Sequence, residues 1–376
     1  MLGGRRQRIG LIDLDTVGSF SSRVPSAPCP NLENLLMMNE MQLPSDTKEA
    51  ASRMRQLVAC PSCGSNDLRD LFDDNDISDN DTLPDPLRRS DYRLCRHCVL
   101  IFASWRQVPE AADAYYDLFP SLEHRDYASY PPPQTYRDNK AKVANWIAGE
   151  LEKEELLKDH VRILHVRCDC GSLGPAIRSH VPNAVVVGLD YFESNVRFAN
   201  ENGNVEASDL SPAGATPLHQ EKFDIIVINH MFTHALDLHS DLGIYLEMLG
   251  EKGALFVYNE IDFSEMLRLG GRYFRLKPVN NYHKQLFSPH SFQRFFASAG
   301  CRIVCAQRRR NSLYALVKRD PTVHFEPASE TEAKTVGEQV EAWMGYRRSL
   351  KGRILSWPPI RKSLKALASP APQLPY

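Results

Sequence analysis

Short apolar runs recur through the middle of the chain and predict buried strands. Five of them read RILHV (162–166), AVVVGLD (184–190), NVEASD (204–209), FDIIVIN (223–229) and GALFVYNE (253–260). Near-continuous apolar runs of this length are typical of strands that are covered on both faces of a parallel sheet. Segments with helical spacing lie between them, for example at residues 240–249, and another precedes the first strand at residues 139–158. This alternation predicts an open, doubly wound α/β sheet.

The pattern changes at the end of the predicted sheet. In the segment FSPHSFQRFFASAG, Ser288 can cap a helix, Pro289 suits its first position, and Gly300 can end it. Two further runs follow, at residues 301–309 and 312–319, and a tight polar turn joins them. They predict an antiparallel hairpin that closes the sheet.

The segments outside this pattern divide the chain into further parts. Residues 1–55 mix glycine, serine, proline and charge without periodicity, so we expect them to be mostly disordered. Residues 56–135 hold paired cysteines and end in a proline-rich linker. The sheet domain is expected to span residues 136–320, and residues 321–376 are interpreted as a C-terminal tail without periodicity. A basic stretch in this tail, residues 346–366, is expected to be solvated; contact with an anionic membrane surface is the alternative.

The composition is that of an ordinary soluble globular protein. Apolar residues make up 43% of the chain, charged residues 24%, and the formal net charge is −2, which argues against nucleic acid as a partner. No apolar run reaches the roughly 20 residues of a membrane-spanning helix. Aspartates interrupt the only candidate leader, IGLIDLDTVG, so we expect a cytoplasmic protein. In that compartment the nine cysteines favour thiols and metal ligands over disulfides.

Four of the cysteines are spaced as metal ligands. Cys60 and Cys63 form one C-x2-C pair, and Cys95 and Cys98 form a second. Each pair can direct two thiolates at one ion, and four thiolates complete a tetrahedral zinc site. Because such a site has no open position for water, we assign the zinc a structural role. His97 lies between two ligands and is interpreted as a surface residue.

Polar residues at the ends of the predicted strands indicate a nucleotide site. Gly171 follows the first strand, and Asp190 ends the second, where a carboxylate can accept hydrogen bonds from both ribose hydroxyls of an adenosine cofactor. Asp209 ends the third strand and can face the adenine amino group or serve in a turn. Asn229 and His230 end the fourth strand at the same edge of the sheet. These features suit NAD and S-adenosylmethionine equally well.

The order of the motifs resembles class I S-adenosylmethionine-dependent methyltransferases. The similar segments are ILHVRCDCGSLG (163–174), VVGLDYFESNVRFA (186–199), VEASDL (205–210), FDIIVINHMFTHALD (223–237, with His234) and LGEKGALFVYNE (249–260). The paired cysteines ahead of the sheet further resemble the zinc-containing sugar C-methyltransferases of deoxysugar biosynthesis. The resemblance covers about residues 56–320 and implies a Rossmann-like methyltransferase sheet preceded by a small zinc-binding module.

The first motif departs from the family at three positions. His165 stands where the family has an acid, and Arg167 and Asp169 replace the first two of three glycines; Gly171 matches the third. Glycine serves there because the backbone passes close to the cofactor and needs positive φ. Aspartate tolerates such φ better than most residues, but Asp169 would repel the methionyl carboxylate, which Arg167 can pair with instead. We therefore expect a loop of the family's shape that binds the cofactor more weakly.

The resemblance implies methyl transfer from S-adenosylmethionine to a sugar or other small metabolite, such as a sugar nucleotide or glycan. His283, in YHKQLFSPHSF, is the implied base that removes a proton from the acceptor, and Tyr127 and Tyr130 are implied contacts of the sugar. A structural role is the alternative for each. Two other functions remain open. The altered first motif favours a catalytically degenerate, methyltransferase-like scaffold or binding protein, whereas the fourth motif and the hairpin argue against a nicotinamide-dependent oxidoreductase.

Overall fold

In the computed structural model the chain is described over most of its central part. The described residues are 53–72, 91–108, 111, 132–156, 160–210, 218, 220–269, 283–309 and 311–348. They all belong to one compact unit, Pro44–Tyr376. Residues 1–52, Tyr127, Tyr130 and the basic stretch beyond residue 348 lie outside the described residues. Among the described residues, no helix has the length and apolarity needed to cross a membrane.

A seven-stranded sheet forms the centre of the structure, with the strand order β12-β13-β10-β9-β6-β7-β8. Its strands are β6 (Arg162–Val166), β7 (Val185–Asp190), β8 (Glu206–Asp209), β9 (Phe223–Asn229), β10 (Leu249–Ile261), β12 (Cys301–Arg309) and β13 (Ser312–Arg319). The first five are parallel to one another, whereas β13 runs antiparallel to both β10 and β12. The predicted doubly wound sheet with an antiparallel hairpin at its edge is confirmed.

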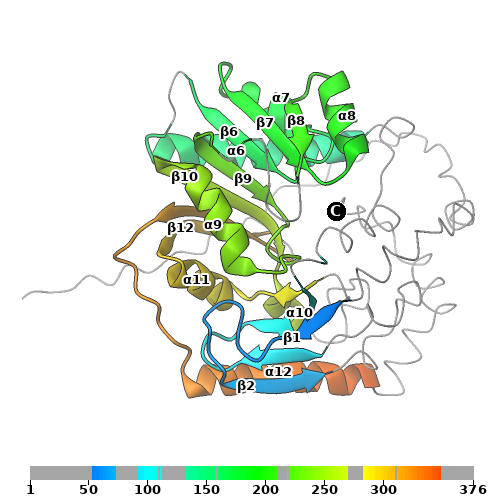
Figure 1. Cartoon of the computed structure of the whole chain (residues 1–376), viewed down its shortest axis with the longest axis vertical. Coiled ribbons are helices and arrows are strands. Elements are labelled where there is room, and N and C mark those ends of the chain that lie inside the picture. The colour runs from blue at the N-terminus through cyan, green and yellow to red at the C-terminus, as the bar shows by residue number, and fades with distance from the viewer. Residues whose placement is uncertain are drawn as a thin grey trace, which may run out of the picture. The chain divides into compact units, whose positions relative to one another are not determined.

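Helices cover both faces of this sheet (Figure 1). They are α6 (Gln134–Lys153), α7 (Leu173–Arg178), α8 (Glu193–Glu201), α9 (Leu238–Met248) and α11 (Pro289–Ser298). Two further helices, α10 (Phe263–Leu269) and α12 (Glu330–Arg348), pack in a separate core. Ile163 and Ile225 pack with α6, α7 and α8, whereas their neighbours Leu164 and Ile226 pack with α9 and α11. Because successive strand residues face opposite sides, a strand buried on both faces is apolar at every position. The predicted cap of α11 is also present, since Ser288 Oγ accepts a hydrogen bond from Ser291 N.

The cysteine-containing segment forms small antiparallel sheets. Their strands are β1 (Met54–Gln56), β2 (Leu68–Phe72), β3 (Tyr92–Cys95), β4 (Ile101–Ala103), β5 (Trp105–Gln107) and β11 (Gln285–Leu286). β1 pairs with β5, and the other sheet has the order β11-β4-β3-β2. The strand β11 comes from a much later part of the chain, just after His283. We call the part of the chain that holds β1 to β5 the front module. Its larger sheet is completed by β11, which belongs to the sheet domain.

Helix α12 corrects the expectation that residues after 320 lack regular structure. It lies alongside β2 (Figure 1), and Trp343 and Met344 are buried in a core with Phe72 and Tyr92 of the front module. An ion pair between Arg69 and Glu341 joins the same two elements. Burial against a neighbouring sheet stabilises a helix whose own pattern is weak.

Candidate active site and metal centre

The loop after β6 adopts a left-handed backbone conformation at three positions. The φ angles are +54° at Arg167, +57° at Asp169 and +72° at Gly171. A Cβ atom on Gly171 would lie 2.9 Å from Cγ2 of Val205, so glycine is required there by space as well as by φ. The left-handed conformation costs about 1–2 kcal/mol for most L-residues, and aspartate tolerates it better than arginine. The loop thus has the backbone course expected from the first motif, although two of its three glycines are replaced.

Asp190, at the end of β7, holds this loop in place. Its buried carboxylate accepts hydrogen bonds from Asp169 N (2.7 Å), Phe192 N (3.1 Å) and Asn195 Nδ2 (3.0 Å). Burial, and next the neighbouring Asp169 carboxylate, raises the pKa of Asp190 to about 6. A carboxylate offers about four lone-pair sites, so roughly one remains for a ligand. This arrangement provides for one ribose hydroxyl; accepting the second, as the sequence suggested, would require a protein donor to leave.

A buried polar network underlies the loop and was missed by the sequence analysis. His165 is fully buried, and its Nε2 lies 3.0 Å from the hydroxyl of Tyr258. The ammonium of Lys140 donates to the same hydroxyl at 3.1 Å. Burial, and then Lys140, holds the pKa of His165 well below its ordinary value, so this imidazole is neutral. The Tyr136 hydroxyl donates to the carboxylate of Asp169 in the loop itself. The acid that the family carries at position 165 is therefore replaced by a neutral ring, and the carboxylate of Asp169 stands four residues later in the chain.

Arg167 and Asn229 connect the cofactor loop to the loop after β9. The Arg167 guanidinium donates to the main-chain oxygen of His230, and Asn229 Nδ2 donates to the main-chain oxygen of Arg167 at 3.3 Å. In this structure Arg167 thus has a partner at the edge of the sheet. Asp209 is exposed and pairs in register with Asp190, so it lies at the same edge.

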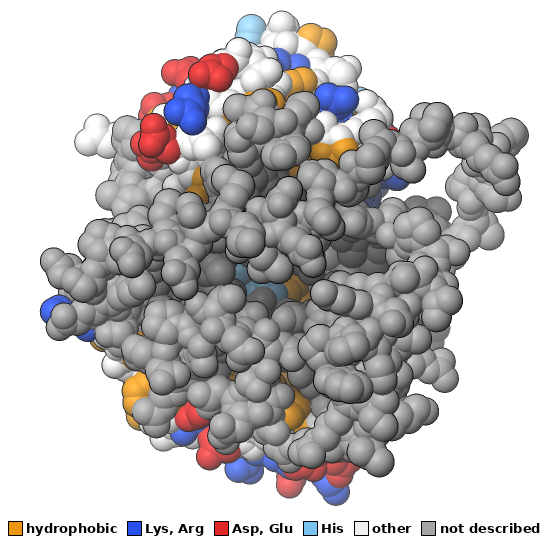
Figure 2. Space-filling view, turned by 90° about the vertical axis from the view of Figure 1, so that its right-hand side faces the viewer, with side chains coloured by type: hydrophobic (Ala, Val, Ile, Leu, Met, Phe, Trp, Pro, Cys, Tyr) orange, Lys and Arg blue, Asp and Glu red, His pale blue; other side chains and the backbone are white. Residues whose placement is uncertain are grey.

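Three histidines meet at this edge of the sheet. Their ring centres lie 4.7 Å apart for His230 and His234, 4.9 Å for His234 and His283, and 5.6 Å for His230 and His283. His234 and His283 are buried, and His230 has a φ of +49°. Figure 2 shows histidine side chains near the centre of the face that it displays. The sequence analysis had singled out each of these residues, but it did not predict that they form one cluster.

The buried carboxylate of Glu260 shapes the loop that carries two of these histidines. It accepts hydrogen bonds from Met231 N (2.7 Å), Phe232 N (2.9 Å) and Thr233 N (2.8 Å). The Thr233 hydroxyl adds a fourth at 2.7 Å. The main-chain oxygen of Thr233 then accepts from Lys284 N at 2.8 Å, which holds the segment next to His283. Glu260 is a second residue that the sequence analysis missed, because a glutamate at the end of an apolar run carries no sign of burial.

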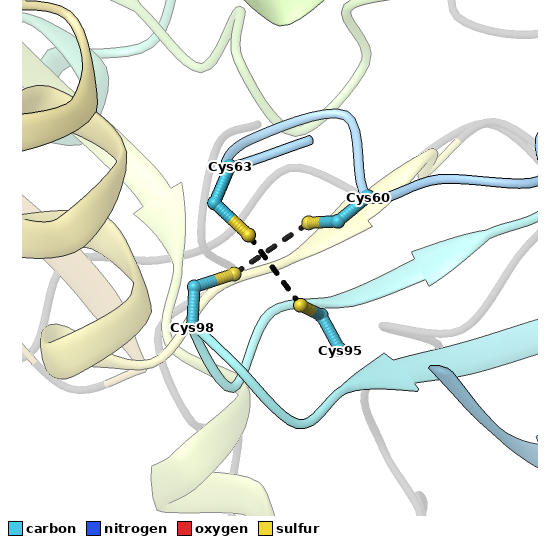
Figure 3. Close-up of side chains that lie close together, drawn as sticks. All are labelled: Cys60, Cys63, Cys95 and Cys98. Atoms are coloured by element: carbon cyan, nitrogen blue, oxygen red, sulfur yellow. Dashed lines mark hydrogen bonds between the residues drawn. The ribbon is translucent and has the colours of Figure 1, made fainter. Parts of the chain in front are cut away.

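The four paired cysteines converge as predicted (Figure 3). The Sγ atoms of Cys60 and Cys98 lie 3.5 Å apart, as do those of Cys63 and Cys95, and all four lie within 4.8 Å of one another. Tetrahedral zinc with Zn–S bonds of about 2.3 Å places its sulfurs about 3.8 Å apart, so the donor set fits this ion. His97 is exposed and its ring stacks on Phe325 at 5.2 Å, as expected of a surface residue.

The two cysteine loops share one backbone design. The residue after the second cysteine donates to the oxygen of the first: Gly64 N to Cys60 O, and Val99 N to Cys95 O, both at 2.9 Å. The donor residue has a positive φ in each loop, +73° at Gly64 and +56° at Val99. A β-branched residue is strained in this conformation and persists there only where its surroundings hold it. The loops are thus matched halves of one site.

Comparisons with known proteins find similarity to methyltransferases. Residues 133–306 match a family model described as "Methyltransferase domain". The malonyl-[acyl-carrier protein] O-methyltransferase of Bacillus cytotoxicus is 25% identical over 179 residues, which cover 47% of this chain and 61% of that protein. A solved S-adenosylmethionine-dependent methyltransferase from Clostridium acetobutylicum is 11% identical with a TM-score of 0.39, covering 55% of this chain and 98% of its own. Magnesium protoporphyrin IX methyltransferase from Synechocystis, with bound SAH, is 14% identical with a TM-score of 0.40, covering 54% and 97%.

The family match and the strand order coincide in one part of the chain. The matched residues begin just before α6 and end within β12, so they contain the parallel strands, the loop after β6 and the histidine cluster. This chain covers about three-fifths of the length of the curated relative. Residues 133–306 are therefore similar to methyltransferase domains, and the seven-stranded sheet at their centre has the Rossmann-like methyltransferase fold.

Proposed function

We propose that this protein transfers a methyl group from S-adenosylmethionine to a small-molecule acceptor bound at the carboxyl edge of the sheet. The observation that carries the proposal is the connection between the loop after β6 and the histidine cluster. Arg167 lies in that loop and donates to the backbone of His230. In open α/β sheets ligands bind at this edge. The connection supports a site in which a cofactor held by the loop would lie next to groups that can act on an acceptor.

The charges around the loop suit the two ends of the cofactor. Asp190 retains about one acceptor site for a ribose hydroxyl, and Gly171 lets the backbone approach the adenosine. Asp169 would receive the methionyl ammonium, with Tyr136 orienting its carboxylate. Asp209 and Asn229, at the ends of neighbouring strands, are candidates for the adenine side of the site. Binding is expected to be weaker than in a loop with three glycines, because Asp169 also repels the methionyl carboxylate.

The acceptor that the resemblance favours is a sugar carbon, presented as a sugar nucleotide or glycan. Methylating a carbon next to a carbonyl requires removal of a proton from that carbon, and the methyl group then passes in line from the sulfonium. His283 is the proposed base. It is buried beside His230 and His234, at the edge of the sheet where the loop after β6 lies. Tyr127 and Tyr130 remain candidate contacts of the sugar; both lie outside the described residues.

The four cysteines are proposed to hold a structural zinc ion. The site fits a closed tetrathiolate, which leaves no position for substrate. It also anchors the front module to the methyltransferase domain, because the main-chain oxygen of Ser62 accepts hydrogen bonds from His239 Nε2 (2.6 Å) and Ser298 Oγ (2.9 Å).

Calorimetric titration with S-adenosylhomocysteine tests the cofactor site, and methyl transfer from labelled S-adenosylmethionine to a panel of sugar nucleotides tests the acceptor. His283→Ala should lower the transfer rate by about a hundredfold or more while cofactor binding remains. Absence of binding by the wild type at millimolar cofactor would support the alternative, a catalytically degenerate scaffold. That alternative is favoured by the three protein donors that already occupy Asp190.

A further inference from the structure

We propose that His230, His234 and His283 bind a divalent transition-metal ion, at a second metal site separate from the four cysteines. One ligand nitrogen from each ring can be chosen so that all three lie within 4.8 Å of one another. Imidazole nitrogen is a preferred ligand of zinc, iron, nickel and copper ions. Binding of the ion does not depend on methyl transfer.

The spacing of the rings fits a shared ion. With zinc–nitrogen bonds of about 2.0–2.1 Å and tetrahedral angles, three imidazole centres around one ion lie about 5 Å apart. The observed separations of 4.7, 4.9 and 5.6 Å bracket this value. The rings are also inclined to one another at 87°, 66° and 85°, which is compatible with rings that approach one ion from three directions. Small side-chain rotations would bring the nitrogens to bonding distance.

The backbone around each ring is held from several sides. His230 N donates to Tyr258 O at 2.9 Å, and the main-chain oxygen of His230 accepts a hydrogen bond from Arg167. His234 N donates to Met231 O at 2.9 Å, in the loop that Glu260 organises. The main-chain oxygen of His283 accepts from the Tyr92 hydroxyl at 2.7 Å. Ligands fixed in this way lose little conformational entropy when a metal binds.

Three protein ligands leave a fourth position for an oxygen of water or of the acceptor. This is the ligand number of catalytic zinc sites, whereas the tetrathiolate site is closed. An ion there would polarise a carbonyl or hydroxyl of the acceptor and so make its neighbouring proton more acidic. A lone pair that binds the ion cannot also take a proton. His283 is therefore a ligand when the ion is present and a base when it is absent.

The test is a calorimetric titration of full-length protein with zinc chloride, after dialysis has left one zinc per chain in the cysteine site. The wild type should take up one further equivalent. His234→Ala should weaken this second binding by about a hundredfold or more, because a three-ligand site becomes a two-ligand site. His230→Asn should weaken it as well, and asparagine tolerates the positive φ of that position. His180→Ala, which removes an exposed histidine elsewhere, should leave it unchanged.

Circular dichroism and binding of S-adenosylhomocysteine report folding of each variant, and either folded variant is sufficient for the test. The proposal is overturned if the wild type takes up no second equivalent, or if that equivalent survives in the folded variants. The proposal is supported if the second equivalent is lost in the His234 and His230 variants but retained in His180→Ala. If the wild type binds S-adenosylhomocysteine but takes up no second zinc equivalent, only the metal site is rejected. If the wild type does not bind S-adenosylhomocysteine, the proposed methyltransferase function is rejected.

Discussion

Replacing Asp190 by asparagine should make cofactor binding weaker and insensitive to pH between about 5 and 7. The carboxylate has three protein donors and room for about one ribose hydroxyl. The variant lacks the charge that strengthens this hydrogen bond, which contributes roughly 1.5–3 kcal/mol. At pH 7 the affinity of Asp190→Asn should therefore be about ten- to a hundredfold below that of the wild type.

The pH dependence of the wild type follows from the pKa of Asp190, which burial and Asp169 raise to about 6. About nine-tenths of the protein carries the charged form at pH 7 and about a tenth at pH 5, so the affinity should fall about tenfold on acidification. The same ionisation affects the free energy of unfolding in the opposite direction. Because the folded state binds this proton more tightly than the unfolded state, ionisation lowers stability as pH rises from about 4 through 6, by up to about 3 kcal/mol. Asp190→Asn should not show this pH-dependent loss of stability.

The measurement is calorimetric titration with S-adenosylhomocysteine at pH 5, 6 and 7, with urea unfolding at the same values. Asp209→Asn is the matched control, because it removes an exposed carboxylate at the end of the adjacent strand and should preserve the tenfold pH effect. An affinity of the wild type that stays constant from pH 5 to 7, or an equal pH dependence in Asp190→Asn, would refute the assignment of Asp190 to the ribose.

Three further variants test other parts of the structure. Asp169→Gly should tighten cofactor binding at neutral pH, since it removes a carboxylate near the cofactor's own and lowers the pKa of Asp190; calorimetry showing weaker binding would instead make the contact with Tyr136 essential. Glu260→Gln should lower the free energy of unfolding by roughly 2–4 kcal/mol, because the amide cannot accept all four hydrogen bonds of the carboxylate and leaves buried donors unpaired. A urea unfolding midpoint equal to that of the wild type would contradict this. Cys60→Ser should release one zinc per chain and unfold the front module while the seven-stranded sheet persists, as measured by metal analysis and amide exchange; full zinc content in the variant would reject the tetrathiolate site.

Local patterns in the sequence were sufficient for the strands of the seven-stranded sheet, its edge hairpin and the convergence of the four cysteines. Consecutive apolar residues indicate burial on both faces, and the C-x2-C spacing directs two thiols at one point whatever surrounds it. The cap at Ser288 is likewise a property of neighbouring residues. Helix α12 is an instructive failure. Its buried positions Ala333, Val340 and Met344 do have helical spacing, but the charged residues between them hid the pattern.

Which residues meet in the candidate site was decided by contacts between segments that are distant in the chain. The buried positions of Lys140, Tyr258 and His165 belong to α6, β10 and β6, and nothing near any one of them in the chain indicates the other two. The histidine cluster likewise joins the loop after β9 to the segment before β11. Periodicity reports which residues are buried, because burial repeats with the geometry of a helix or strand. It does not report which buried residues meet, because that depends on how separate elements pack and on hydrogen bonds such as those of Glu260.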